Sequence, residues 1–333
     1  MKQPKRTSSR HAVGPDALLQ ALEPGADEAL LHQALAHAHY RPVAQAAALA
    51  ADGLHYALEP ALMEAFRRFA ALDHKRDPGC IAKGALARAL VALDSLDAAF
   101  FRDGLKLRQL EPTWGESVDT AGDVRASCAM GLAASGDTGA LLDLVDLLVD
   151  PEHRARSGAV RAIGCTEPRA ASAVLRTKAL LGDAEPEVTG ECFRALLAVD
   201  ADGGPGFVAR WLDGAGGVEL AELAALALGE SRLDAAVAAL RARWEAEPFR
   251  RPWHQVLLRA AALARSDAAL AWLLGLAADA DAGTARQVVE VLAVNRHQRR
   301  VADALRTRLA TRGDAALLAA FRAEFGNAAE ADP

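Results

Sequence analysis

Apolar residues in this chain recur at intervals of three and four positions, a spacing that places them on one face of an α-helix. Four nine-residue stretches share one version of the pattern, with small or apolar residues at the first, fifth and ninth positions. They are AKGALARAL (82–90), VRASCAMGL (124–132), ARSGAVRAI (155–163) and VTGECFRAL (188–196). Aspartate precedes each stretch, together with Pro or Gly, and these residues favour the start of a helix. We therefore predict a helix at each stretch.

The pattern also repeats along the chain. With weaker copies included, eight starts fall at residues 42, 82, 124, 155, 188, 220, 256 and 285, which are spaced 29 to 42 residues apart. Between starts there is room for a second apolar helix, such as TGALLDLVDLLVD. Repeated helix hairpins of this length cannot bury their apolar faces alone and must stack on one another. The sequence predicts an all-α fold, an α-α superhelix of seven or eight hairpins.

One repeat carries a resemblance to a known family. The segment LLDLVDLLVDPEHRARSGAVRAIG resembles a HEAT-like repeat of the short bacterial type first noted in phycobilisome lyases. The shared features are an apolar first helix, an Asp-Pro turn, and a second helix that opens with a base. The resemblance covers roughly residues 40–310 and is strongest over 77–200. It implies a solenoid and gives little information about activity.

Composition and the chain ends agree with one helical domain. Hydrophobic residues make up 52% of the chain, mostly alanine and leucine, and aromatic residues 5%. No apolar run is long enough to span a membrane. The basic N-terminal segment lacks the apolar region of a secretory signal. We expect a disordered basic tail over 1–14, a single solenoid over 15–326 and a flexible C-terminus over 327–333.

Motifs of catalysis and of cofactor or metal binding are missing from the sequence. It has no GxSxG, P-loop, HExxH or His-Glu dipeptide, and His32, His37 and His39 do not have the spacing of a helical metal site. The four cysteines are far apart and form no CxxC pair, which suits core residues in a reducing cytoplasm. We expect a bacterial cytoplasmic protein without catalytic residues, cofactor or metal.

Charge is unevenly distributed. Residues 111–240 hold 21 acids and 10 bases, whereas the segments before and after carry small positive charges. Nucleic-acid binding requires a basic face, so this acidic middle argues against it. The basic stretch NRHQRRVADALRTR (295–308) is either a solvated helix surface or a dock for an acidic partner or a second copy.

Basic residues recur at two positions within the best repeats. One set stands one residue after the repeat start and is predicted to pair with turn aspartates such as Asp123 and Asp150. This structural set is Lys83, Arg125 and Arg156. The other stands six residues after the start and is predicted to contact a partner along the concave face. This binding set is Arg88, Arg161 and Arg194.

The segment QLEPTWGESVDTAGDVR (109–125) does not read as a helix throughout. Its second half, DTAGDVR, is a helix start, but LEPTWGES lies in the longest spacing between repeats. Trp114 stands between Glu111 and Glu116 in this insertion. Two readings remain: an exposed anchor for a partner, or a side chain that folds back over the groove between two repeats.

The function expected from these features is a non-catalytic scaffold or adaptor that binds a protein or peptide along the concave face. Solenoids present long rigid surfaces without needing a catalytic cleft. The alternative is an enzyme or enzyme accessory that uses the solenoid as a substrate cradle, like a lyase or a DNA glycosylase. Trp211, Trp253 and Trp272 are candidate aromatic residues for such a cleft, although large apolar anchors within helices explain them as well.

Overall fold

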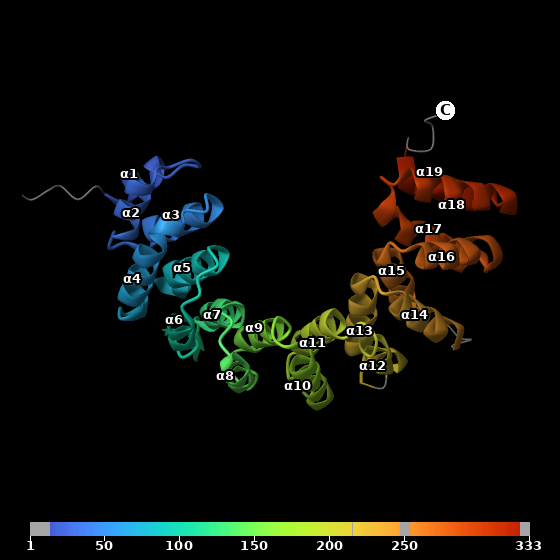
Figure 1. Ribbon diagram of the computed structural model, residues 1–333. Helices are drawn as coiled ribbons and strands as arrows, with labels where there is room; N and C mark the ends of the chain where they lie inside the picture. The colour runs from blue at the N-terminus through green and yellow to red at the C-terminus, as the bar shows by residue number, and fades with distance from the viewer. Residues whose placement is uncertain (1–13, 215, 247–253, 327–333) are drawn as a thin grey trace, which may run out of the picture. The chain divides into compact units, whose positions relative to one another are not determined.

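The computed structural model describes residues 14–214, 216–246 and 254–326. Almost all of the predicted N-terminal tail and the whole of the predicted C-terminal segment lie outside these residues. Apart from one short β-hairpin, the regular elements described are helices (Figure 1), so the prediction of an all-α fold is confirmed. The helices form two compact units, residues up to Thr166 and residues from Glu167. The prediction of one continuous domain stays a prediction.

Unit 1 is built from successive helix hairpins and one β-hairpin. Its helices are α1 (Pro15–Ala21), α2 (Glu28–Leu35), α3 (Tyr40–Asp52), α4 (Glu59–Ala70), α5 (Ile81–Ala92), α6 (Ala98–Gly104), α7 (Gly122–Ala134), α8 (Ala140–Leu147) and α9 (His153–Ile163). Short 3-10 turns lie at Tyr56–Leu58, His74–Arg76 and Pro78–Cys80, and the strands are β1 (Leu110–Pro112) and β2 (Ser117–Asp119). Helices α3, α5, α7 and α9 pack on one another in order and form what we call the odd-helix layer. Each even-numbered helix packs on the odd helix that follows it.

Unit 2 repeats this arrangement. Its helices are α10 (Pro168–Leu181), α11 (Pro186–Val199), α12 (Gly204–Val208), α13 (Val218–Ser231), α14 (Asp234–Ala246), α15 (Gln255–Ala264), α16 (Asp267–Asp279), α17 (Ala282–Leu292), α18 (Arg299–Arg312) and α19 (Ala315–Phe325). The 3-10 segment Ala209–Asp213 extends α12, and another lies at Ala293–Asn295. Helices α11, α13, α15, α17 and α19 pack in sequence as the odd-helix layer of this unit.

Each of the eight repeat starts falls in an odd-numbered helix, from α3 to α17. The described residues contain one hairpin more than the upper estimate, because α18 and α19 form a ninth. The sequence pattern missed α19 since its buried positions are Leu317, Phe321 and Phe325 instead of the alanine-rich form.

Small residues let the odd helices approach closely. A Cβ atom at Gly158 of α9 would collide with Ala126 of α7, and one at Gly229 of α13 would collide with the backbone of Ala260 in α15. Glycine weakens a helix interior by roughly 0.5–1 kcal/mol relative to alanine. Here that cost is offset by the contact between neighbouring helices, which explains why these two positions hold glycine.

Candidate functional site

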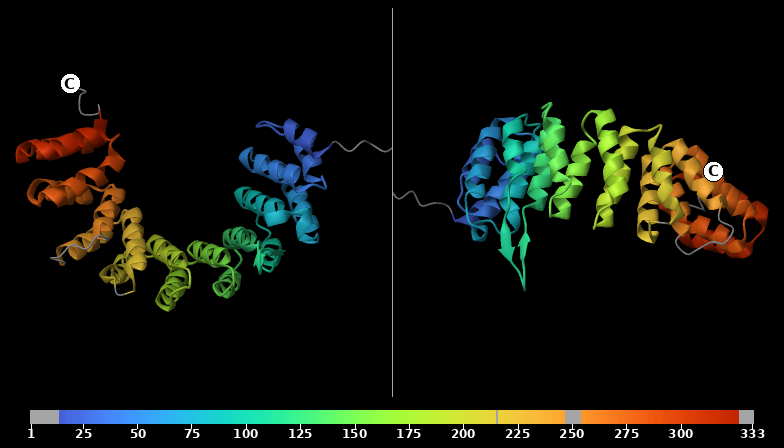
Figure 2. Two further views of the ribbon diagram at one scale, coloured as in Figure 1. Left: turned by 180° about the vertical axis from the view of Figure 1, so that it is seen from behind. Right: turned by 90° about the horizontal axis from the view of Figure 1, so that it is seen from below.

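Residues 109–120 form a β-hairpin between α6 and α7, which we call the Trp114 hairpin. Its strands are antiparallel, with Leu110 opposite Asp119 and Pro112 opposite Ser117. The turn is closed by Thr113, whose backbone N–H donates to the carbonyl oxygen of Glu116 at 3.0 Å. Gly115 has a φ of 109°, a backbone conformation that residues other than glycine rarely adopt. Figure 2 shows in its right-hand view that the hairpin projects past the helices around it.

The tip and sides of the hairpin expose apolar side chains. The relative exposure of Trp114 is 107%, that of Leu110 is 62% and that of Val118 is 45%. Trp114 therefore does not fold back over a groove between repeats, which was one of its two readings from the sequence. Glu116 is also exposed at the tip.

Glu111, expected beside Trp114, instead points into the root of the hairpin. Its Oε1 accepts hydrogen bonds from the N–H of Gly79 at 2.6 Å, the amide of Gln109 at 2.7 Å and the hydroxyl of Thr120 at 2.8 Å. Burial raises the pKa of Glu111, but these bonds outweigh it, so the pKa lies below its ordinary value. Glu111 thus fastens the hairpin to the turn before α5.

A second anchor is the buried side chain of Arg125 on α7. Its guanidinium donates to Asp119 Oδ2 at 2.8 Å, to Asp150 Oδ1 at 2.7 Å and to the carbonyl oxygen of Leu107 at 2.8 Å. The half-exposed Arg108 adds a bond to Asp150 Oδ2 at 2.8 Å. Arg125 therefore links the hairpin, the end of α6 and the turn before α9.

Asp119 and Asp150, the two acids of this network, each accept several hydrogen bonds. Burial raises the pKa of Asp119, but hydrogen bonds from the N–H groups of Gln109 and Ala121 and the charge of Arg125 outweigh it and lower the pKa. Asp150 accepts from Arg108 and Arg125 and, through Oδ1, from the N–H of Glu152 at 2.8 Å. Both aspartates thus lie among several hydrogen-bond donors.

The structural set of bases shares one spacing. Each base contacts the residue six positions before it, in the segment that precedes its own helix. Lys83 Nζ lies 3.0 Å from Asp77 Oδ2, and both side chains are almost wholly buried. Arg125 contacts Asp119 in the same way, and Arg156 donates to the carbonyl oxygen of Asp150 at 2.8 Å.

The fourth repeat has Thr189 where the other three have a base, but the same turn is still neutralised. Asp183 stands six residues before Thr189, and Lys178 of α10 supplies the cation at 2.7 Å. Of the acids at this offset, Asp150 was predicted from the sequence, whereas Asp77, Asp119 and Asp183 were missed, although the constant spacing of six was a usable signal. Asp123, one of the predicted partners, instead pairs with Arg154 at 2.7 Å.

The binding set occupies solvent-facing positions of odd helices. Arg88 on α5 and Arg161 on α9 are exposed, and α7 lies between these two helices. Neighbouring helices pack about 8–10 Å apart, so the two arginines stand roughly 20 Å apart across the layer. Arg194 belongs to α11 in unit 2, where it is half-buried and pairs with Glu191 at 3.2 Å.

Two arginines of the basic C-terminal stretch, residues 295–308, form ion pairs within unit 2. Arg300 pairs with Asp267 at 2.7 Å and Arg306 with Asp303 at 2.9 Å. Arg299 is exposed on the same helix. Self-association through this stretch stays a prediction.

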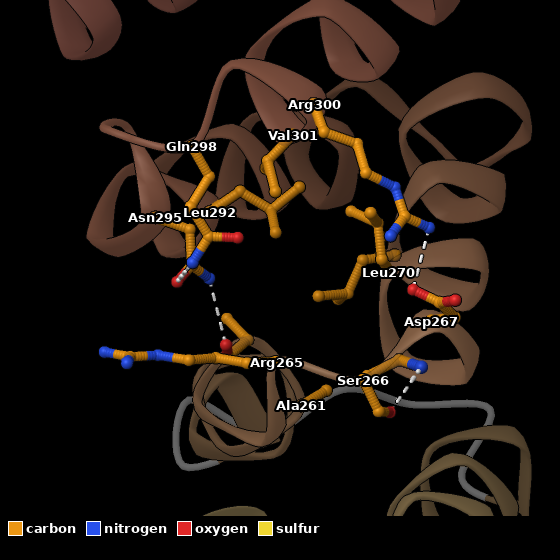
Figure 3. A pocket seen from close by; sticks show the side chains of 13 residues that line it. Ala261, Arg265, Ser266, Asp267, Leu270, Leu292, Asn295, Gln298, Arg300 and Val301 are labelled. Carbon is orange, nitrogen blue, oxygen red and sulfur yellow. Dashed lines mark hydrogen bonds and ion pairs between the residues drawn. The ribbon is translucent and has the colours of Figure 1, made fainter.

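Two hollows of unit 2 bear on the candidate tryptophans and on a small-molecule site. One lies between the ends of α15, α16 and α18 (Figure 3), with Asn295 donating to the carbonyl oxygen of Ala262 at 3.0 Å. Its volume is about 50 Å³, which is space for a few water molecules. A hollow of about 800 Å³ runs along α14 and α16 past Trp244 and Trp272, but it is open to solvent. These two tryptophans are buried core residues, and Trp253 lies outside the described residues.

The three buried cysteines, Cys80, Cys128 and Cys192, lack the character of nucleophiles. Burial raises the pKa of Cys128 and of Cys192 to about 12 and that of Cys80 to about 11, so these thiols stay protonated at neutral pH. Within the described residues, no group of three or more His, Cys, Asp or Glu side chains is arranged to hold a metal ion. None of the described helices has both the length and the apolar character needed to cross a bilayer.

Comparisons with known proteins give no family. No protein-family model matches the chain, and no curated protein is significantly similar to it. Among solved structures, the chain is similar to an engineered protein from the Northeast Structural Genomics Consortium, with 19% identity over 96% of this chain and 92% of that one. The TM-score is 0.38, which is too low to establish a common fold.

Proposed function

We propose that this protein is a non-catalytic, HEAT-like scaffold that binds an acidic segment of a partner protein along the exposed face of its odd-helix layer. The observation that carries the proposal is the exposure of Arg88 in α5 and of Arg161 in α9, which stand at the same position of their repeats in the odd-helix layer of unit 1.

The surroundings of these two arginines support an extended protein ligand. Ile81 lies one helical heptad before Arg88 on the same face and is 48% exposed, and Met130 of α7 is half-buried between the two arginine-bearing helices. An extended chain spans about 3.3 Å per residue, so roughly six residues would reach from one arginine to the other. The face therefore offers cations with apolar contacts between them, which fits an acidic peptide containing one or two apolar side chains.

The HEAT-like nature of the repeats is part of the proposal and is supported by their turns. A base early in the second helix returns to the turn residue six positions earlier in three repeats, and Lys178 replaces that base in a fourth. We place the protein in the cytoplasm, because three of its four cysteines are buried free thiols that would suit a reducing compartment.

The test is quantitative affinity capture from a lysate of the source organism. The bait carries Arg88→Glu, Arg161→Glu and Arg194→Glu together. A control bait carries the same change of charge at exposed arginines elsewhere, Arg169→Glu, Arg299→Glu and Arg322→Glu. We expect the main partner to be lost from the first bait and retained by the control. Retention of every partner by both baits would refute binding through this face.

A further inference from the structure

We propose that the Trp114 hairpin is a second, separate docking element that inserts its indole into an apolar pocket with a basic rim on a folded partner protein. The inference goes beyond the proposed binding of a peptide by the odd-helix layer. It uses the hairpin itself, residues 109–120, and does not depend on Arg88 or Arg161.

The exposed side chains of the hairpin have no role in the described fold. Trp114 is exposed at 107%, and Leu110 and Val118 add apolar surface along the strands. A tryptophan side chain carries 150–250 Å² of mostly apolar area, which is unfavourable to leave in water. Tryptophan is also the residue type most enriched at the energetic centres of protein interfaces.

The hairpin is fixed before any partner arrives. Glu111 accepts three hydrogen bonds at the root, Arg125 ties Asp119 to Asp150, and Gly115 sets the turn. Binding then does not need to order the loop, and a preorganised element binds more tightly for that reason.

The shape and charge of the hairpin define the partner. A narrow projecting tip fits a concave receiver, and a short peptide cannot surround it. Glu116, two residues after Trp114, is exposed and forms no ion pair within the described part of the chain, so the rim of the pocket should supply a cation. The same carboxylate would lose its hydration in a bilayer interface and would be repelled by anionic lipids, which favours a protein over a membrane.

The test begins with a photo-crosslinking residue, p-benzoylphenylalanine, placed at position 114. A control carries it at Leu142, a large apolar side chain on α8 that is 75% exposed. After irradiation in lysate of the source organism, the adduct specific to position 114 is identified by mass spectrometry. That protein is then produced pure, and its affinity is measured for the wild type, Trp114→Ala, Glu116→Gln and Leu142→Ala.

We expect Trp114→Ala to weaken binding at least about 30-fold, the size of an interface hot spot. Glu116→Gln should weaken it several-fold and reduce its dependence on salt. Leu142→Ala should change it less than about twofold, and the triple arginine variant should retain the crosslink at position 114. Equal thermal transitions of the wild type and Trp114→Ala check that the hairpin variant is folded.

Four outcomes overturn the proposal. The first two concern crosslinking: no adduct specific to position 114 forms, or the adduct is with a second copy of this chain. The third is that phosphatidylglycerol vesicles bind the wild type but not Trp114→Ala. The fourth is that Trp114→Ala and Leu142→Ala have equal affinity for the crosslinked protein. Loss of partners from the triple arginine variant alone concerns the odd-helix face and leaves this contact intact, so the two proposals fail separately.

Discussion

Replacing Arg125 by methionine tests the central anchor of the hairpin. Methionine keeps most of the side-chain volume but removes three hydrogen bonds, to Asp119 at 2.8 Å, to Asp150 at 2.7 Å and to the carbonyl oxygen of Leu107 at 2.8 Å. The side chain of Asp150 is only 1% exposed and that of Asp119 13%, so both carboxylates would lose a buried cation. The variant should therefore be strongly destabilised.

The size of the effect follows from what remains around the two acids. Removing one member of a buried ion pair costs about 3–5 kcal/mol. Arg108 still lies 2.8 Å from Asp150 and 3.7 Å from Asp119, so neither acid is left without a cation. Arg125 Nε is buried without a hydrogen-bond partner in the described chain, and methionine also removes that unfavourable group. We therefore expect the lower end, about 3 kcal/mol.

The assay is urea denaturation followed by far-UV circular dichroism, combined with hydrogen exchange of α7, α8 and α9 to separate unit 1 from the rest. The matched control is Arg154→Met on α9. Its ion pair with Asp123 has the same length, 2.7 Å, but side-chain exposures of 61% and 57%. Exposed pairs contribute about 0–1 kcal/mol. Hydrogen exchange in α7 should therefore accelerate in Arg125→Met and stay close to wild type in Arg154→Met.

A double-mutant cycle separates the ion pair from the packing of the side chain. If the bond between Arg125 and Asp150 carries the effect, Asp150→Asn should cost less in the Arg125→Met background than alone. The reasoning would be refuted if Arg125→Met and Arg154→Met were equally stable, because burial would then not determine the value of these pairs.

The remaining predictions concern the tip, the root and the helix contacts. Trp114→Ala should change the free energy of unfolding by less than about 0.5 kcal/mol in denaturant titration, because the side chain lies in solvent; a larger loss would mean that it packs on the fold. The lowered pKa of Glu111 contributes stability that is complete above its ordinary value of 4.5 and is lost as pH falls through the folded value. The protection of the hairpin amides from hydrogen exchange, relative to their intrinsic rate at each pH, should therefore fall below about pH 4.5 in the wild type and change less in Glu111→Gln. Gly229→Ala should lower the free energy of unfolding by about 1–3 kcal/mol, because the added methyl meets the backbone of α15. Gly275→Ala on α16 should instead raise the free energy of unfolding by up to about 1 kcal/mol, because nothing lies within 4 Å of the added methyl. Opposite signs at the two glycines are the decisive observation.

Local patterns predicted the helical elements well. Apolar spacing identified eight odd-numbered helices from α3 to α17. It could do so because a helix buries one face, and the residues of that face recur in the sequence at intervals of three and four. The pattern failed at α19, whose large aromatic core residues do not resemble the alanine-rich repeats. Separating the bases into two sets was also possible from the sequence, because positions one and six of a repeat lie on different faces of its helix.

The sequence by itself therefore determined the eight odd-numbered helices from α3 to α17 and the faces that they bury, because both depend on neighbours three and four positions away. Only the tertiary structure decided the direction of the side chains in the Trp114 hairpin. Glu111 turns inward because Gly79, 32 residues earlier, offers it an N–H group, and Asp119 is fixed by Arg125, which also reaches Asp150 25 residues later. Trp114 is exposed because the strand pairing and Gly115 carry the turn away from the helices. These contacts join segments that no local period connects, so they exist only once the repeats have stacked.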